Sequence, residues 1–345
     1  MMKPVGIGVV GLGKHGERYV GHLEHDLPGL RVVAVSRRDD RQGRSRAASL
    51  GARYYPDVWG LAADREVAGI VSVVPPSLHP EVVRACAAEG KPLLVEKPFA
   101  INSKAASAMA GQIQDAGIPV MVSHTLRFSS AVQRARDWLP DIGSLHQIIL
   151  GQSFEPSRLS WLDDPTISGG GNILHTGIHE FDLARYLTGA EVREVHCMAG
   201  RVATEKTEDS FVATLFMGDA AGCRILGSVT ASRGTRSRYG EIRLIGSRGQ
   251  IFCDHALNRA ILLGENGVVA EESLPNVPTV REALKAFEKV VRGAESPTIT
   301  VDDGLQAVGI VDACYRSLRS GRRVTLPQAQ ENTNAYLRHA RPRRP

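Results

Sequence analysis

The chain reads VGIGVVGLGKHG over residues 5–16. The apolar run 5–10 predicts a buried strand, and a G-x-G-x-x-G motif follows it where a helix would begin. The first glycine of such a motif permits a tight turn, the second lets the backbone approach a pyrophosphate, and the third lets the helix pack on the strand. The start of that helix also attracts phosphate through its unpaired N–H groups. The stretch predicts a dinucleotide site, with a ligand-free glycine turn as the alternative, at Gly11, Gly13, Lys14, His15 and Gly16.

Apolar runs alternate with helix-like segments up to about residue 122. Runs without polar alternation are typical of a parallel sheet covered on both faces, and β-α repetition is typical of a doubly wound fold. The predicted strands are residues 5–10, 31–35, 69–74, 92–95 and 119–122. We therefore expect an α/β Rossmann domain over residues 1–123.

The pattern changes beyond Ser123. Amphipathic helices are expected near residues 131–139 and 172–187, and a final helix near 303–320. Strand-like segments lie between them, including residues 194–201, 210–216, 223–229, 239–245 and 250–253. This order predicts an α+β domain over residues 124–327, with a mainly antiparallel open sheet that carries helices on one face. The Arg/Pro-rich residues 328–345 are expected to be a disordered tail.

Composition narrows the classes of function. A chain of 345 residues exceeds the usual size of one core, and 43% hydrophobic with 23% charged residues is typical of a globular protein. Five dispersed cysteines without a C-x-x-C pair favour neither a disulfide framework nor a thiolate metal site. With no secretory signal pattern and no apolar run of membrane length, we expect a protein of the reducing cytoplasm without a membrane partner.

The net charge of +5 does not by itself indicate a nucleic-acid partner. Much of the basic excess lies in residues 37–46 and 338–343, and no basic stripe is interleaved with aromatic residues. Solvated segments are therefore favoured over nucleic-acid binding.

The residues after the second predicted strand bear on the choice of cofactor. NAD-binding proteins usually carry an acidic residue there, which accepts hydrogen bonds from the adenosine ribose. This chain has Ser36, Arg37 and Arg38 instead. Guanidinium groups can hold a 2′-phosphate that a carboxylate would repel, so we expect NADP. NAD is the alternative, in which Asp39 would serve the ribose and the arginines would lie at a solvated helix start.

Two later motifs complete a family pattern. One is Leu94-Val95-Glu96-Lys97-Pro98, and the other runs from a glycine triplet, Gly169 to Gly171, through His175-Thr176-Gly177-Ile178-His179 to Asp182. With the glycine turn, these motifs make nearly the whole chain resemble the Gfo/Idh/MocA family, the glucose–fructose oxidoreductase and inositol 2-dehydrogenase group. The resemblance implies hydride transfer between a nicotinamide cofactor and a secondary alcohol or ketone of a sugar, cyclitol or related polyol.

Glu96 and Lys97 follow a predicted buried strand, so they lie at the carboxyl edge of the sheet, where doubly wound folds bind ligands. The resemblance implies a cis Lys97–Pro98 peptide and a Lys97 side chain that faces the nicotinamide and holds the reacting oxygen. Without that context, an ordinary surface lysine would be an equally good interpretation of Lys97. Pro75 and His79 resemble the family's cofactor-contacting turn, although Val74 stands where a threonine is often found.

His175, His179 and Asp182 are spaced to share one face of a helix, and we expect that face to line the substrate cleft. The resemblance implies that His179 is the acid/base group beside the substrate hydroxyl, a role that suits an imidazole. His175 replaces a common aspartate, so it either binds substrate hydroxyls or a carboxylate, or marks a chain that kept binding and lost turnover. Histidines at this spacing can also share zinc or pack in a core, but with no third ligand beyond Asp182 we expect no metal.

Further residues are expected at the substrate. Arg127 matches an arginine/aromatic segment near the family's substrate cleft, while Arg158 and Trp161 could contact a polyhydroxylated ligand or simply lie in a surface loop. Two other functions stay open: an NAD-dependent glycosidase with transient internal redox, and a non-catalytic, cofactor-sensing binding protein. The open sheet would bury its free face most simply in a homo-oligomer, a dimer or tetramer.

Overall fold

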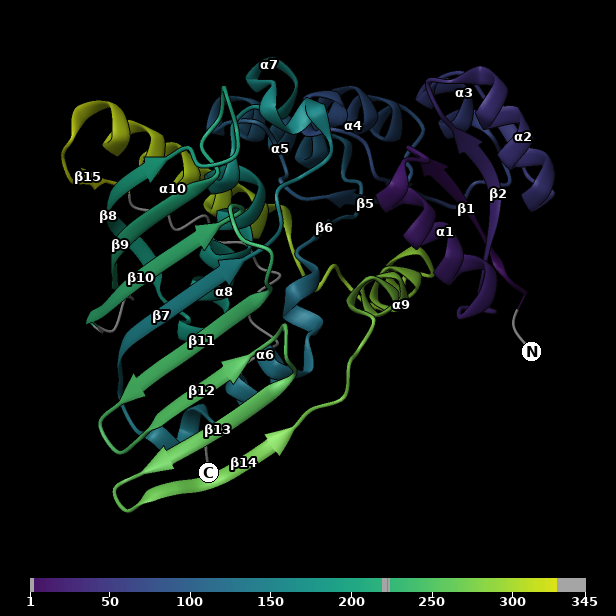
Figure 1. The fold of residues 1–345 in the computed structure, drawn as a ribbon. Helices are drawn as coiled ribbons and strands as arrows, with labels where there is room; N and C mark the ends of the chain where they lie inside the picture. Colours follow the sequence, from purple (N-terminus) through teal and green to yellow (C-terminus); the bar gives the residue numbers. More distant parts are fainter. Residues whose placement is uncertain (1–2, 219–221, 223, 328–345) are drawn as a thin grey trace.

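Two β-sheets organise the chain in the computed structural model, which describes residues 3–218, 222 and 224–327 (Figure 1). The predicted tail, residues 328–345, lies outside the described residues. One sheet is built from the first third of the chain and the other from the remainder.

The first sheet has six parallel strands in the order β3-β2-β1-β4-β5-β6. Its strands are β1 (Val5–Val10), β2 (Leu30–Ser36), β3 (Arg53–Tyr55), β4 (Gly69–Ser72), β5 (Leu93–Glu96) and β6 (Val120–Ser123). The helices between them are α1 (Lys14–His25), α2 (Asp40–Leu50), α3 (Val58–Ala63), η1 (Pro76–Leu78), α4 (His79–Ala88) and α5 (Ser103–Ala116). This confirms the Rossmann prediction. The strand order reverses between β1 and β4, and such a switch point is where doubly wound folds bind ligands.

All five strands predicted for this sheet are present. Strand β3 was not predicted, because it has only three residues and none of them is fully buried, so it lacks an apolar run.

The second sheet has nine strands in the order β14-β13-β12-β11-β7-β10-β9-β8-β15. Its neighbours are antiparallel except for β7 and β10, which are parallel. The strands are β7 (Leu145–Ser153), β8 (Glu191–Gly200), β9 (Ser210–Gly218), β10 (Arg224–Ser232), β11 (Tyr239–Gly246), β12 (Gln250–Asp254), β13 (Arg259–Gly264), β14 (Gly267–Ser273) and β15 (Val324–Thr325). The expected mainly antiparallel sheet is therefore confirmed.

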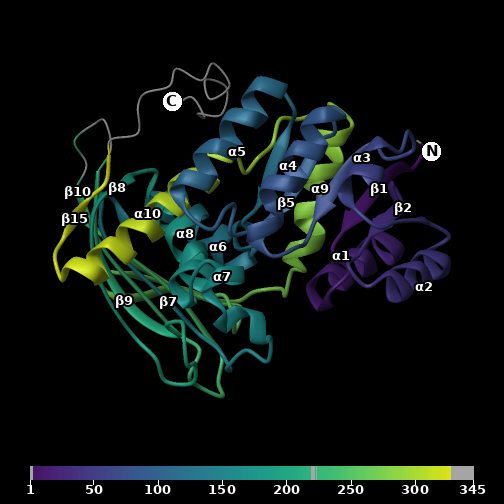
Figure 2. The same ribbon diagram turned by 90° about the horizontal axis from the view of Figure 1, so that it is seen from above.

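Helices cover one face of this second sheet (Figures 1 and 2). Those in contact with its strands are α6 (Ser130–Asp137), η3 (Leu139–Ile142), α8 (Ile178–Thr188) and α10 (Val301–Ser320), while η2 (Thr125–Phe128), η4 (Ser160–Asp163) and α7 (Pro165–Ser168) pack mainly against other helices. The strands alternate accordingly: in β10, Ile225 is buried and Leu226 is 61% exposed.

The second half of the chain also returns to the first sheet. Helix α9 (Thr279–Val291) packs against α1 and β4, where Phe287 and Val291 come so close to Gly69 that a side chain there would clash. Figure 2 shows α9 lying beside the Rossmann elements. A backbone bond from Val122 N–H to Ile299 O, 3.1 Å long, also crosses between the halves.

The helix predicted near residues 172–187 is not a uniform α-helix. It begins as a π-helical turn, Ile173–Gly177, and continues as α8. Gly177 at the end of this turn lets the Phe211 ring pack closely, because the ring lies 2.6 Å from where a Cβ atom would stand. π-helical turns inside helices are frequent at functional sites.

Candidate active site

The glycine turn has the shape that a pyrophosphate needs. Gly11 has a φ of +95°, and a Cβ there would lie 2.4 Å from Val73 O. A Cβ on Gly16 would lie 1.9 Å from Gly11 O, so this glycine lets α1 pack against the turn. At Gly13, by contrast, a Cβ would meet nothing within 4 Å. Neighbouring backbone therefore packs closely against the first and third glycines of the motif, whereas the space beside the second glycine is open. This arrangement fits a dinucleotide pyrophosphate at the start of α1.

The end of β2 supports this turn and presents the arginines. Ser36 O accepts a 2.9 Å bond from Gly11 N–H, and Arg37 Nη1 donates to Leu12 O at 2.8 Å. Arg38 is exposed. The Asp39 carboxylate caps α2 by accepting from Gln42 N and Nε2 at 2.9 and 2.5 Å. Arg37 therefore lies against the glycine turn and also donates to the Gln42 side chain, which in turn donates to Asp39, so both charged groups have protein partners.

Glu96 connects the first turn of α1 to the end of β5. Its buried carboxylate accepts from His15 Nε2 at 3.0 Å, from the Tyr19 hydroxyl, and from Lys97 N–H at 3.0 Å. Burial raises the pKa of Glu96, but the hydrogen bond and charge of His15 and the charge of Lys97 outweigh it and bring the pKa to about 2. Glu96 is therefore an anion that holds His15 and faces the lysine.

Lys97 reaches from the Rossmann edge to the second domain. The Lys97–Pro98 peptide is cis, as the family resemblance implied, and Lys97 Nζ donates to His175 O at 3.1 Å. Burial lowers the pKa of Lys97 and the charge of Arg233 lowers it further, while Glu96 raises it, for a result of about 8. The ammonium is protonated at neutral pH but loses its proton more readily than an ordinary lysine.

His175 and His179 lie at the start of the helix that Lys97 contacts. His175 Nε2 lies 3.1 Å from Ser168 O, and the Trp161 ring meets its imidazole edge-on at 5.6 Å. Burial, followed by the charges of Lys97 and Arg233, lowers the pKa of His175 to about 3. Burial and the charge of Lys97 likewise hold the pKa of His179 well below its usual value. Both imidazoles are therefore neutral at neutral pH.

Arg127 and Asp182, both expected at the substrate, bind each other. Arg127 Nε and Nη2 donate to the Asp182 carboxylate at 2.8 and 2.6 Å, and Nη2 lies 2.8 Å from Asp303 Oδ1. The guanidinium also stacks on the Tyr186 ring at 4.8 Å. Burial lowers the pKa of Arg127, but Asp182 and Asp303 more than compensate and raise it. This ion-pair network is buried, and its guanidinium and carboxylates already have protein partners.

The remaining predicted residues fall into two groups. Pro75 belongs to the turn after β4. The two residues before it, Val73 and Val74, pack against Gly11 of the glycine turn. His79 is fully buried and its ring nitrogens face Phe99 O and Val74 O at 3.1 and 3.2 Å, so it positions this turn. In the loop after β7, Trp161 is half-buried beside His175, whereas Arg158 is exposed.

Three neighbours of this site were not predicted. His124, directly after β6, meets the His179 ring edge-on at 6.4 Å, with its Nδ1 3.9 Å from Asp182 Oδ2. Its position at the carboxyl end of a predicted strand was a signal that could have identified it. His255 and Arg233 both influence the pKa of His179, yet they follow strands far along the chain. Only the sheet brings them near, so their sequence surroundings carry no such signal.

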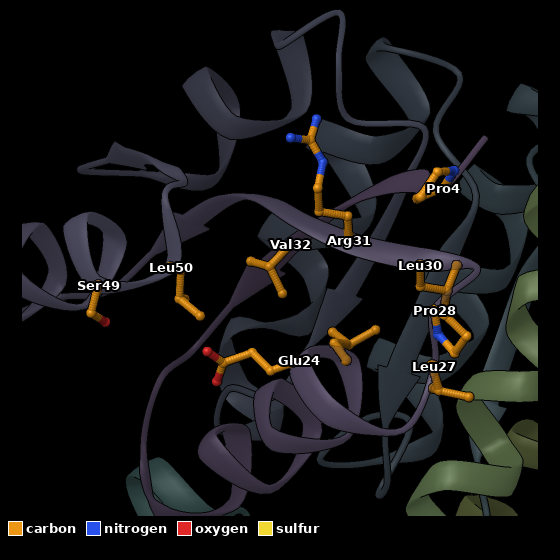
Figure 3. Close-up of a pocket in the computed structure, with 10 residues that line it drawn as sticks. Pro4, Glu24, Leu27, Pro28, Leu30, Arg31, Val32, Ser49 and Leu50 are labelled. Carbon is orange, nitrogen blue, oxygen red and sulfur yellow. The ribbon is translucent and has the colours of Figure 1, made fainter.

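Another pocket lies at the opposite end of the Rossmann domain, between α1 and the start of β2 (Figure 3). Its charged lining residues are already paired, Glu24 with Arg46 at 2.8 Å and Arg31 with Glu66 at 3.7 Å. It includes none of the residues described above.

Within residues 3–218, 222 and 224–327, no three His, Cys, Asp or Glu side chains are grouped to hold a metal ion, and no helix is long and apolar enough to cross a membrane. The four described cysteines, Cys86, Cys197, Cys253 and Cys314, are free and buried.

Comparison with known proteins adds independent findings. Residues 5–124 match the sequence model of an oxidoreductase family with an NAD-binding Rossmann fold, and residues 141–326 match that family's C-terminal alpha/beta domain. The chain is 28% identical to the myo-inositol 2-dehydrogenase of Thermotoga maritima, over 93% of this chain and 98% of that protein. It is 27% identical to the scyllo-inositol 2-dehydrogenase (NAD(+)) of Bacillus subtilis, over 94% and 97%. A crystal structure of a probable dehydrogenase from Thermotoga maritima matches with a TM-score of 0.79 and 26% identity, over 93% and 98%.

Proposed function

This chain belongs to the Gfo/Idh/MocA family of oxidoreductases, and on that premise we propose that it oxidises or reduces a sugar, cyclitol or related polyol at a secondary carbon. The names of the inositol dehydrogenases support this substrate class. The observation that carries the proposal is the contact of Lys97 Nζ with His175 O, which joins the end of β5 to the histidine helix. The charge of this buried amine also lowers the pKa of His175 and His179, so the amine lies within electrostatic range of two neutral imidazoles.

The chain's own residues suit the two tasks that this reaction needs. A bound nicotinamide would accept or donate the hydride. The Lys97 ammonium can donate a hydrogen bond to the reacting oxygen and stabilise negative charge there, more strongly in a buried site than in water. His179 is neutral, so it can accept the carbinol proton during oxidation and return it during reduction.

A substrate screen tests the proposal directly. Purified full-length protein is supplied with NADP⁺ or NAD⁺ and a panel of sugars, cyclitols and polyols, and the absorbance of reduced cofactor is followed. The reverse reaction is assayed with the matching ketones. We expect cofactor reduction with at least one panel member. Failure of every member in both directions, by protein shown to bind the cofactor, would reject the proposed activity.

We also propose NADP as the preferred cofactor. Arg37 is held against the glycine turn, whereas Asp39 caps the N-terminus of α2. This arrangement favours binding of a 2′-phosphate by Arg37 over binding of the ribose by Asp39. Replacing Arg37 with serine should raise the KM for NADP⁺ about 10- to 100-fold, the worth of a charged hydrogen-bonded phosphate contact. The KM for NAD⁺ should change little. Arg65→Ser removes an exposed charge elsewhere in the domain and serves as the control. Equal changes for both cofactors would contradict the assignment.

We further propose that the chain forms a homo-oligomer and that the helix-free face of the second sheet is its subunit interface. Met198 and Val212 lie opposite each other on β8 and β9 and are 68% and 51% exposed, and Leu226, farther along the same face on β10, is 61% exposed. Such a surface favours burial against a second copy. Val212→Glu should therefore shift the molar mass measured by light scattering to that of the monomer. A wild-type protein that is already monomeric would exclude this interface.

A further inference from the structure

Arg233 is a cation without a counter-ion beside the residues proposed for catalysis. It follows β10, near the middle of the second sheet (Figure 1). Its Nε donates to Thr176 Oγ1 at 3.2 Å, and its guanidinium lies 5.8 Å from the centre of the Phe154 ring. Within the part of the chain that the structure describes, no carboxylate forms an ion pair with Arg233, and burial alone lowers its pKa. The two terminal nitrogens likewise have no hydrogen-bond partner among those residues.

The carboxylates that line the same pocket are engaged elsewhere. Asp163 accepts from the backbone N–H groups of residues 205–207, and Asp209 accepts from those of residues 202–204. Glu208 accepts from the Tyr315 hydroxyl at 2.8 Å and from Ile173 N–H at 3.0 Å. The pocket thus contains acidic residues, but none of them neutralises the guanidinium.

The charge of Arg233 lies close to the proposed reaction site. His175 and Arg233 line one pocket, and Thr176, which holds the guanidinium, directly follows His175. The charge of Arg233 also contributes to the lowered pKa of Lys97, His175 and His179. A partly buried cation without a counter-ion carries a desolvation cost, and a second cation nearby adds repulsion. A bound anion would remove both costs.

We propose that Arg233 binds a carboxylate of the substrate, so that the substrate class is sugar acids, such as uronates, aldonates or carboxylated cyclitols. This inference rests on the proposed function. With Nε held by Thr176, the two terminal nitrogens are free to bind a carboxylate as a planar pair. A carboxylate presents two oxygens in one plane, which matches this pair of donors, and the phosphate monoester in the test below distinguishes the two kinds of anion.

Matched pairs of ligands test this inference. Full-length protein loaded with reduced cofactor, which cannot accept hydride from an alcohol, is titrated by calorimetry with glucose and glucuronate, galactose and galacturonate, and glucose 6-phosphate. We expect the best carboxylate to bind about 10- to 100-fold more tightly than its neutral partner, the range for a charged hydrogen-bonded contact. Arg233→Gln should remove that advantage and leave the neutral ligand within a few-fold. Arg238→Gln, which removes an exposed arginine paired with Glu155, is the matched control and should change neither.

A conservative variant separates binding from folding. Arg233→Lys keeps the charge but not the planar pair of donors, so it should retain the fold and show an intermediate preference. Acids that bind no better than neutral partners, or an Arg233→Gln variant that weakens both equally, would overturn the inference, and so would a preference for the phosphate. Because affinity is measured without turnover, these outcomes are distinct from the failure of all panel members to transfer hydride, which would reject the proposed function itself.

Discussion

Lys97→Met should lower kcat about 10³-fold, because it removes the ammonium that is proposed to stabilise the reacting oxygen. Losing one positioned proton donor or oxyanion donor typically costs 10²- to 10⁴-fold. Methionine preserves much of the apolar stem, and the site is already buried, so the fold and cofactor affinity should persist. Steady-state rates with the substrate found by screening measure the effect, and cofactor fluorescence measures binding.

The pH profile gives the Lys97 prediction a signature beyond loss of rate. The pKa of Lys97 is lowered to about 8. The side chain is therefore protonated below that pH and loses its proton as the pH rises through it. His179 has a lowered pKa and is already neutral in this range. The kcat/KM for alcohol oxidation should therefore be level near neutrality and fall above about pH 8. Lys97→Arg should lose this limb, because a guanidinium stays charged at these pH values.

The exposed Lys104 on α5 provides a matched control. Lys104→Met should leave both the rate and the pH profile unchanged. Full turnover by a folded Lys97→Met variant would remove Lys97 from the mechanism.

Arg127→Met should lower the free energy of unfolding by about 3–5 kcal/mol, which is typical when one partner of a buried ion pair is removed. Asp182 is 1% exposed, and without Arg127 its carboxylate would stay buried with no guanidinium beside it. Asp303 would suffer less, because Arg185 Nη1 also reaches it at 3.3 Å. Urea unfolding followed by circular dichroism measures the change.

Arg136 offers the comparison for this variant. It stacks on the same Tyr186 ring at 4.7 Å, but it is exposed and forms no ion pair among the described residues. Arg136→Met should therefore cost under about 1 kcal/mol, as surface substitutions usually do. If the two variants proved equally stable, the Arg127 network would not be a major contributor to stability.

Local motifs predicted the central part of the candidate site. The glycine turn, Lys97 and the histidine helix each occupy a short stretch whose chemistry depends on near neighbours in the chain. Asp182 belongs to the histidine motif and Arg127 to the segment after β6, yet these two side chains pair with each other in the structure. Sequence spacing could not reveal this pair, because 55 positions separate its members and only packing brings them into contact.

The sequence by itself determined the Rossmann fold, the antiparallel second sheet and the residues that border the cofactor turn. It could do so because hydrophobic periodicity and glycine conformations act over a few residues. The tertiary structure alone decided that α9 returns to the first sheet, that Asp39 is occupied by capping, and that Arg233 and His255 lie near His179. Those outcomes depend on which strands become neighbours, and strand pairing joins residues that are distant along the chain.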